Sequence, residues 1–427
     1  MLHSPALQRR LANTGSATFI LIAGLVAFVT YGCIYALRKP FTAASFSGME
    51  ILGVHYKIAL VISQVLGYAI AKFIGIRFIS SLGAGRRAAA VLAMITIAVC
   101  ALLGFALTPP SWGLFWMFLN GLPLGMGWGL IFSYVEGRRV TEALAAFLCV
   151  NFIISAGFVK TIGRWMMLDW GLSEFWMPFA VAMLFMPALL LGLWLLEHLP
   201  PPSAADVAQR SQREAMNNSS RKDMFRRYLP GLAVLVIIYL ALTIMRDVRD
   251  NFTIELWTEL GYGAQPAILT TTELPVALFV LMLIGALIFI KDNRRALLAN
   301  HAILVVGALM MFMTTLLFQG GYLSPVLWMM LSGVGVFLPY ILFNGVIFDR
   351  LLGAFRESGN VGFLIYIADS IGYVGSISVL LWRNFGNSEI GWVQFFTDLC
   401  LYGAVLIFVF SILSWQYFRR KYKTTFG

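Results

Sequence analysis

The chain has 427 residues, of which 60% are hydrophobic and only 12% are charged, and its mean hydropathy is +0.82. Soluble domains are roughly half apolar and about a quarter charged, so this composition excludes a soluble enzyme, a nucleic-acid-binding domain and a disulfide scaffold. An outer-membrane barrel is excluded as well, because its alternating strands give a much weaker hydropathy signal. The apolar excess predicts an all-α integral membrane protein whose helices cross the lipid bilayer, each over about 20 residues.

Twelve apolar segments follow one another along the chain, and each is long enough to cross a bilayer as a helix. The expected spans are residues 16–46, 56–80, 88–108, 112–135, 142–165, 173–196, 229–254, 266–290, 296–318, 323–348, 358–382 and 391–417. The longest polar stretch contains Pro200-Pro201-Pro202 and separates the sixth span from the seventh. The sequence therefore predicts a six-helix half at 1–197, a linker at 198–228 and a second six-helix half at 229–427.

Basic residues set the expected orientation, because cytoplasmic loops of membrane proteins carry an excess of Lys and Arg. The formal net charge is +11, and pairs such as Arg86-Arg87 and Arg294-Arg295 follow even-numbered spans, whereas the loops after spans three and nine carry neither Lys nor Arg. We therefore expect an inner-membrane protein with both termini in the cytoplasm. The four cysteines and four histidines are scattered, so no metal or other cofactor is expected.

Three short motifs recur six spans apart and in the same order, which indicates that the two halves are pseudo-symmetric. The pairs are Arg38-Lys39-Pro40-Phe41-Thr42 with Arg249-Asp250-Asn251-Phe252-Thr253, Gly83-Ala84-Gly85-Arg86-Arg87-Ala88 with Lys291-Asp292-Asn293-Arg294-Arg295-Ala296, and Ser155-Ala156-Gly157-Phe158-Val159 with Ser370-Ile371-Gly372-Tyr373-Val374. Two such halves joined by a basic linker resemble the major facilitator superfamily. That resemblance implies a substrate site near the membrane midplane, between the halves.

Within that superfamily, three segments resemble motifs of the organophosphate:phosphate antiporters. Residues 35–41 are similar to the family's Tyr-x-x-Arg-Lys-x-Phe, residues 71–74 to its Ser-Lys-Phe-Ile, and residues 239–250 to its seventh-span stretch with an intramembrane Arg. The resemblance implies that Arg38, Lys72 and Arg246 face a central cavity and hold the phosphate of a substrate.

The chain departs from that pattern at two places. Asn151 stands in span five where the family has a His, and the loop after span two lacks the family's acidic residue although Gly85-Arg86-Arg87 remains. These differences indicate a divergent branch. The expected substrate is therefore a small organic anion, either phosphorylated or carboxylated.

The residues themselves support an anion site, because an ionisable side chain at membrane depth usually faces a cavity or a partner. Arg38 and Arg249 occupy equivalent positions in the two halves, and a guanidinium binds a carboxylate or phosphate through two hydrogen bonds. For Arg38 and Lys72 the alternative is a side chain that reaches back to the membrane surface. For Arg249 and Arg246 it is neutralisation by the neighbouring Asp247 or Asp250.

Four further polar residues are candidates for the site. Tyr35 and Asn151 can hydrogen-bond a substrate, or equally a neighbouring helix. Glu273 and Asp369 can exchange a proton during transport or form permanent ion pairs with cavity arginines. Desolvation raises the pKa of a carboxyl group and a nearby cation lowers it, so a carboxylate that alternates between these surroundings can couple proton movement to transport.

These observations predict a secondary transporter that works by alternating access, through anion exchange or proton coupling, and that is monomeric and binds no nucleic acid. An enzyme is not expected, because the sequence shows no nucleophile or metal constellation. Two alternatives stay open: a membrane sensor that has lost transport, and a lipid or muropeptide carrier of the same fold.

Overall fold

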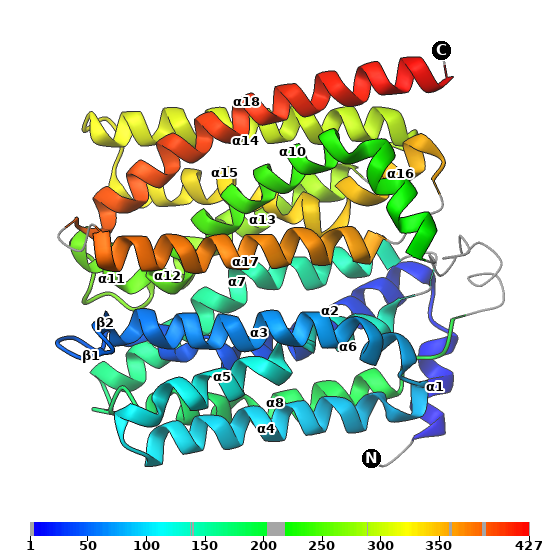
Figure 1. Cartoon of the computed structure of the whole chain (residues 1–427). Coiled ribbons are helices and arrows are strands. Elements are labelled where there is room, and N and C mark those ends of the chain that lie inside the picture. The colour runs from blue at the N-terminus through cyan, green and yellow to red at the C-terminus, as the bar shows by residue number, and fades with distance from the viewer. Residues whose placement is uncertain are drawn as a thin grey trace. The chain divides into compact units, whose positions relative to one another are not determined.

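The computed structural model describes residues 4–136, 138, 141–202, 218–287, 289–357, 361–386 and 390–426, and most of them are helical (Figure 1). The chain forms two compact units. Unit 1 contains Met1–Arg210 together with Thr253–Thr258 and Tyr262–Thr271, and unit 2 contains Ser211–Phe252, Glu259–Gly261 and Thr272–Gly427.

The helices of unit 1 are α1 (Pro5–Ala12), α2 (Ser16–Arg38), α3 (Tyr56–Ser81), α4 (Arg87–Leu107), α5 (Gly113–Leu124), α6 (Gly127–Val135), α7 (Thr141–Leu168), α8 (Met177–Glu197), α11 (Thr253–Glu259) and α12 (Ile268–Thr271), with Glu259 itself assigned to unit 2. Three short 3₁₀ helices are η1 (Pro40–Ala43), η2 (Ala84–Arg86) and η3 (Pro110–Trp112). In this unit α2 packs against α7 and α8, α3 against α5, and α12 against α7.

The helices of unit 2 are α10 (Asn218–Asn251), α13 (Glu273–Leu287), α14 (Asn293–Gln319), α15 (Pro325–Gly345), α16 (Ile347–Phe355), α17 (Val361–Gly386) and α18 (Trp392–Phe426). Here α10 packs against α15, α17 and α18, and α14 packs against α15, α16 and α18. Helix α13 lies against α15. The ionisable candidates of unit 2 lie on α10, α13 and α17.

The expected membrane helices are present. In the described part of the chain, eleven helical stretches are long and apolar enough to cross a membrane. Helix α3, with 26 residues, lies at the position of the remaining expected span. The prediction of an all-α, multi-pass integral membrane protein is therefore confirmed.

Two helix ends differ from the expected spans. Helix α2 ends at Arg38 and the chain continues as η1, because Pro40 has no N–H with which to extend the helical hydrogen bonds. Arg38 is therefore the last residue of its helix and does not lie inside it. Helix α10 begins at Asn218, within the stretch expected to be linker.

A two-stranded hairpin connects η1 to α3. Strands β1 (Glu50–Ile51) and β2 (Val54–His55) pair antiparallel, with Leu52 and Gly53 between them. Both turn residues have positive φ, 53° and 71°, as the two-residue turn that matches strand twist requires. The hairpin leads directly into Tyr56 and Lys57, the first residues of α3.

Glycines allow α3 and α5 to approach closely. A Cβ atom on Gly67 would meet the backbone oxygen of Phe118, and a Cβ on Gly121 would meet the backbone oxygen of Gln64. Small residues at such positions are what lets membrane helices pack backbone to backbone. This contact fixes α3, which carries Gln64, Tyr68 and Lys72, against the rest of unit 1.

Candidate functional site

The cations predicted in unit 1 meet at one aromatic ring. The Arg38 guanidinium carbon lies 3.9 Å from the centroid of the Tyr68 ring, and the Lys72 Nζ atom lies 5.4 Å from the same centroid. Both cations are half-buried, whereas Tyr68 is buried. The face of an aromatic ring attracts a cation electrostatically. Residues from two helices thus form one cluster, which we call the Arg38–Tyr68–Lys72 cluster.

Two buried amides hold the end of α2 that carries Arg38. The Gln64 Nε2 atom donates to the Arg38 carbonyl oxygen at 3.0 Å and to Asn120 Oδ1 at 2.8 Å. The Asn120 Nδ2 atom donates in turn to the carbonyls of Leu37 and Ala98. The last carbonyls of a helix have no partner within it, and these amides satisfy two of them. Sequence reasoning missed Asn120, although an Asn before Gly121 in an apolar span is itself a signal.

Tyr35 and Asn151 are both buried, on α2 and α7. The Tyr35 ring packs edge-on against Tyr31, with the centroids 5.5 Å apart. The Asn151 Oδ1 atom accepts a hydrogen bond from Ser155, while Nδ2 has no hydrogen-bond partner among the described residues. A buried amide donor in this state is costly unless something else accepts from it. Asn151 therefore has a buried donor group that a polar acceptor would satisfy.

In unit 2 the Arg246 side chain is paired both with a carboxylate and with a phenol. Its Nε atom donates to Asp247 Oδ1 at 3.0 Å, and its Nη1 atom donates to the Tyr340 hydroxyl. The guanidinium carbon also lies 4.3 Å from the centroid of the Tyr340 ring. Asp247 was expected as a neutralising partner of this arginine, and the structure has that pair. Tyr340 was not expected.

The hydrogen bonds continue from Tyr340 to the carboxylate of Asp369. The Tyr239 and Tyr340 hydroxyls are 3.2 Å apart, and their rings are stacked with centroids at 5.3 Å. The Tyr239 hydroxyl donates to Asp369 Oδ1, and Asn344 Nδ2 donates to the Tyr239 oxygen at 3.3 Å. Arg246 and Asp369 are therefore joined through two tyrosine hydroxyls, on α10, α15 and α17. Phenols within hydrogen-bond reach of one another can pass a proton along such a chain.

Arg249 and Glu273 form a separate, buried ion pair in unit 2. Arg249 Nη1 lies 2.6 Å from Glu273 Oε1, and the two side chains are 2% and 8% exposed. Arg249 Nη2 also donates to the Met329 carbonyl at 2.9 Å, and the guanidinium lies over the Phe337 ring. A Cβ atom on Gly333 would lie 2.8 Å from Nη2, so a glycine there leaves space for the guanidinium. In this conformation Arg249 is an ion-pair residue, one of the two roles predicted for it.

No metal centre is found among the described residues, because no three His, Cys, Asp or Glu side chains there are grouped closely enough to hold a metal ion.

Sequence comparisons give two matches. A family model described as a family of unknown function, DUF5690, matches residues 40–421. The chain is also similar to a probable actinorhodin transporter from Streptomyces coelicolor, at 26% identity over 166 residues. That match covers 38% of this chain and 27% of the relative, so it spans about a quarter of that protein.

Solved structures resemble the chain over nearly its whole length. A D-xylose-proton symporter superposes with a TM-score of 0.63 at 14% identity, covering 92% of this chain and 98% of the other. The nucleoside transporter NupG gives 0.61 at 16% identity, with the same coverage of 92% and 98%. The major facilitator superfamily proton:xylose symporter XylE gives 0.58 at 15% identity, covering 94% and 96%. These likenesses confirm the major facilitator fold.

Proposed function

The chain belongs to the DUF5690 family, and we propose that it is a secondary transporter that moves a small organic anion across the inner membrane by alternating access. The fold and the partial similarity to a probable transporter support the transporter class. Both termini are proposed to lie in the cytoplasm, on the distribution of Lys and Arg between the loops.

The proposal of an anionic substrate is based on the Arg38–Tyr68–Lys72 cluster. Two cations from different helices meet at one buried ring, and the carbonyl end of the helix that holds Arg38 is fixed by Gln64. Ionisable side chains within membrane helices commonly mark a substrate pathway, and we propose that a negative group of the substrate binds to these two cations. These positions also resemble the phosphate-binding positions of the organophosphate:phosphate antiporters.

We assign the substrate's charged group to Arg38 and Lys72 of unit 1, and we propose Arg246 of unit 2 separately as a substrate-binding cation. Arg246 already pairs with Asp247 and Tyr340, so it would bind the substrate by exchanging one of these partners. The buried Nδ2 of Asn151 supplies a neutral donor. Arg249, held by Glu273, is assigned a structural role.

The test is counterflow uptake into proteoliposomes with a panel of organic phosphates and carboxylates. Arg38→Gln and Lys72→Gln are each expected to lower uptake of the transported anion by at least about tenfold, because a charge-assisted hydrogen bond contributes roughly 1.5–3 kcal/mol. Arg420→Gln is the matched control, because that exposed arginine lies at the far end of α18. Full uptake by both site variants would refute the assignment.

A further inference from the structure

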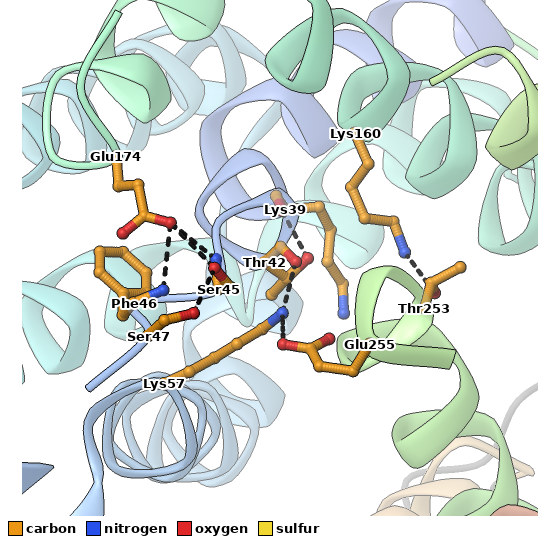
Figure 2. A network of polar contacts seen from close by, with 10 residues as sticks. All are labelled: Lys39, Thr42, Ser45, Phe46, Ser47, Lys57, Lys160, Glu174, Thr253 and Glu255. Atoms are coloured by element: carbon orange, nitrogen blue, oxygen red, sulfur yellow. Dashed lines mark hydrogen bonds and ion pairs between the residues drawn. The ribbon is translucent and has the colours of Figure 1, made fainter. Parts of the chain in front are cut away.

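Three lysines of unit 1 are buried where α2 ends and α3 begins. Lys39, Lys57 and Lys160 are 4%, 0% and 2% exposed. They come from the end of α2, the start of α3 and the middle of α7. Figure 2 shows their side chains directed toward the segment that carries Thr253 and Glu255. Buried ammonium groups are costly, so a cluster of them needs compensating negative charge.

The carboxylate bound to this cluster comes from α11. The Lys57 Nζ atom lies 2.5 Å from Glu255 Oε1 and donates to the Thr42 carbonyl at 2.8 Å. The Lys160 Nζ atom donates to the Thr253 hydroxyl at 3.1 Å. Although α11 follows α10 in the sequence, Thr253–Thr258 belongs to unit 1. Glu255 is thus a carboxylate that the chain itself delivers to the lysines.

Glu174, another acidic side chain in Figure 2, makes hydrogen bonds to the backbone. Its Oε1 atom accepts hydrogen bonds from the backbone N–H groups of Ser45 and Phe46 at 2.9 and 3.1 Å. Phe46 has a positive φ of 50°, so this carboxylate holds a strained turn. Glu255, by contrast, binds a lysine directly.

The fit of Glu255 is incomplete. Its Oε1 atom meets Lys57, whereas its buried Oε2 atom has no hydrogen-bond partner among the described residues. The Glu255 side chain is 15% exposed, while that of Lys57 is fully buried. An anion with more freedom to orient can use its oxygens better than a tethered carboxylate does, because charge-assisted hydrogen bonds depend on geometry.

We propose that Lys39, Lys57 and Lys160 form an anion-binding site that Glu255 fills as a tethered ligand, and that a free phosphate or carboxylate competes with Glu255 for it. The site is separate from the Arg38–Tyr68–Lys72 cluster, and the proposal does not depend on transport. Binding of the free anion releases Glu255 from Lys57, and α11 then loses this contact with α3.

Inorganic phosphate is the probe, and the thermal unfolding of the purified full chain in lipid nanodiscs is the readout. A ligand that binds only the folded protein raises the unfolding temperature with its concentration, which gives an apparent Kd. In Glu255→Gln the competitor is gone, so phosphate is expected to bind at least about tenfold more tightly than in the wild type. In the double variant Glu255→Gln, Lys57→Gln this gain in phosphate affinity is expected to be lost.

Two controls separate this site from other phosphate binding. Glu259 is the last residue of α11, and its carboxylate accepts a hydrogen bond from the backbone N–H of Val393. Glu259→Gln is therefore expected to respond to phosphate as the wild type does. The double variant Arg38→Gln, Glu255→Gln keeps the tight response, because phosphate binds at the lysines. If the Glu255→Gln protein does not fold, Glu255→Asp is used in its place, and its gain in phosphate affinity is expected to be intermediate.

Equal phosphate responses in the wild type, Glu255→Gln and the Lys57→Gln double variant would overturn the proposal. Loss of the tight response with Arg38→Gln would also overturn it, because phosphate would then be bound at the substrate cluster. Acetate is run beside phosphate at equal ionic strength. A gain for either anion that depends on Lys57 supports the site and identifies which of the two binds.

Discussion

The Arg249 guanidinium contacts the Glu273 carboxylate, the Met329 carbonyl and the Phe337 ring, all in unit 2. Removing one partner of a buried ion pair leaves an uncompensated charge, which typically costs about 3–5 kcal/mol. We therefore expect Arg249→Gln to lower the free energy of unfolding by about that amount, and Arg249→Gln with Glu273→Gln to cost less than the sum of the two single changes. A double-mutant cycle from denaturant unfolding measures this.

A different result would change the role assigned to Arg249. If Arg249→Gln kept the wild-type stability and abolished uptake, this arginine would be a substrate ligand. The sequence predicted that a cation at this depth needs a partner. It also predicted that Glu273 can pair with a cavity arginine. It could not predict that this arginine is Arg249, because the contact depends on how α13 packs against α15 beside Gly333.

Asp369 ends the hydrogen-bonded chain that begins at Arg246, and this position supports a role in proton coupling. We expect Asp369→Asn to keep exchange of substrate at equal pH on both sides. It should lose accumulation driven by a pH gradient, which reaches about tenfold per proton for each pH unit. Tyr239→Phe removes only the hydroxyl that bonds Asp369, and it should act in the same direction. Gradient-driven accumulation that survives Asp369→Asn would exclude this carboxylate as the coupling group.

At the scale of elements, the contact between α3 and α5 depends on Gly67 and Gly121. An added Cβ at either position meets backbone that has no rotamer to change, so Gly121→Ala is expected to destabilise the protein by about 1–3 kcal/mol. Gly285→Ala is the control, because a Cβ there meets nothing within 4 Å and alanine favours a helix. Unfolding in denaturant compares the two variants, and equal stabilities would contradict the proposed helix contact.

Hydropathy predicted the membrane helices well, because the thickness of the bilayer's hydrocarbon core sets the length of an apolar helix that crosses it. The ends of the helices were harder to predict. Pro40 ends α2 directly after Arg38, although the apolar sequence continues, and α10 starts inside a polar stretch. The cluster of Arg38 and Lys72 was predicted as a set of cations, but the Tyr68 ring between them was not. Nothing in periodicity distinguishes that tyrosine from others that face a neighbouring helix.

At the scale of the whole molecule, the sequence repeat predicted the fold, and the structural comparisons confirm it. The repeat did not predict that Thr253–Thr258 belongs to unit 1, where Glu255 and Thr253 contact Lys57 and Lys160. The boundaries 1–197, 198–228 and 229–427 stay a prediction.

Whether the substrate is an anion is measured most directly by counterflow with the phosphorylated and the free form of one hexose. Proteoliposomes that contain the wild-type protein are loaded with a hexose phosphate or with the free hexose, and uptake of the labelled form is followed. We expect counterflow of an anionic substrate class, and we expect Arg38→Gln to abolish it. Uptake of the free sugar or of a nucleoside, with no response to any phosphate or carboxylate and no effect of Arg38→Gln, would contradict it.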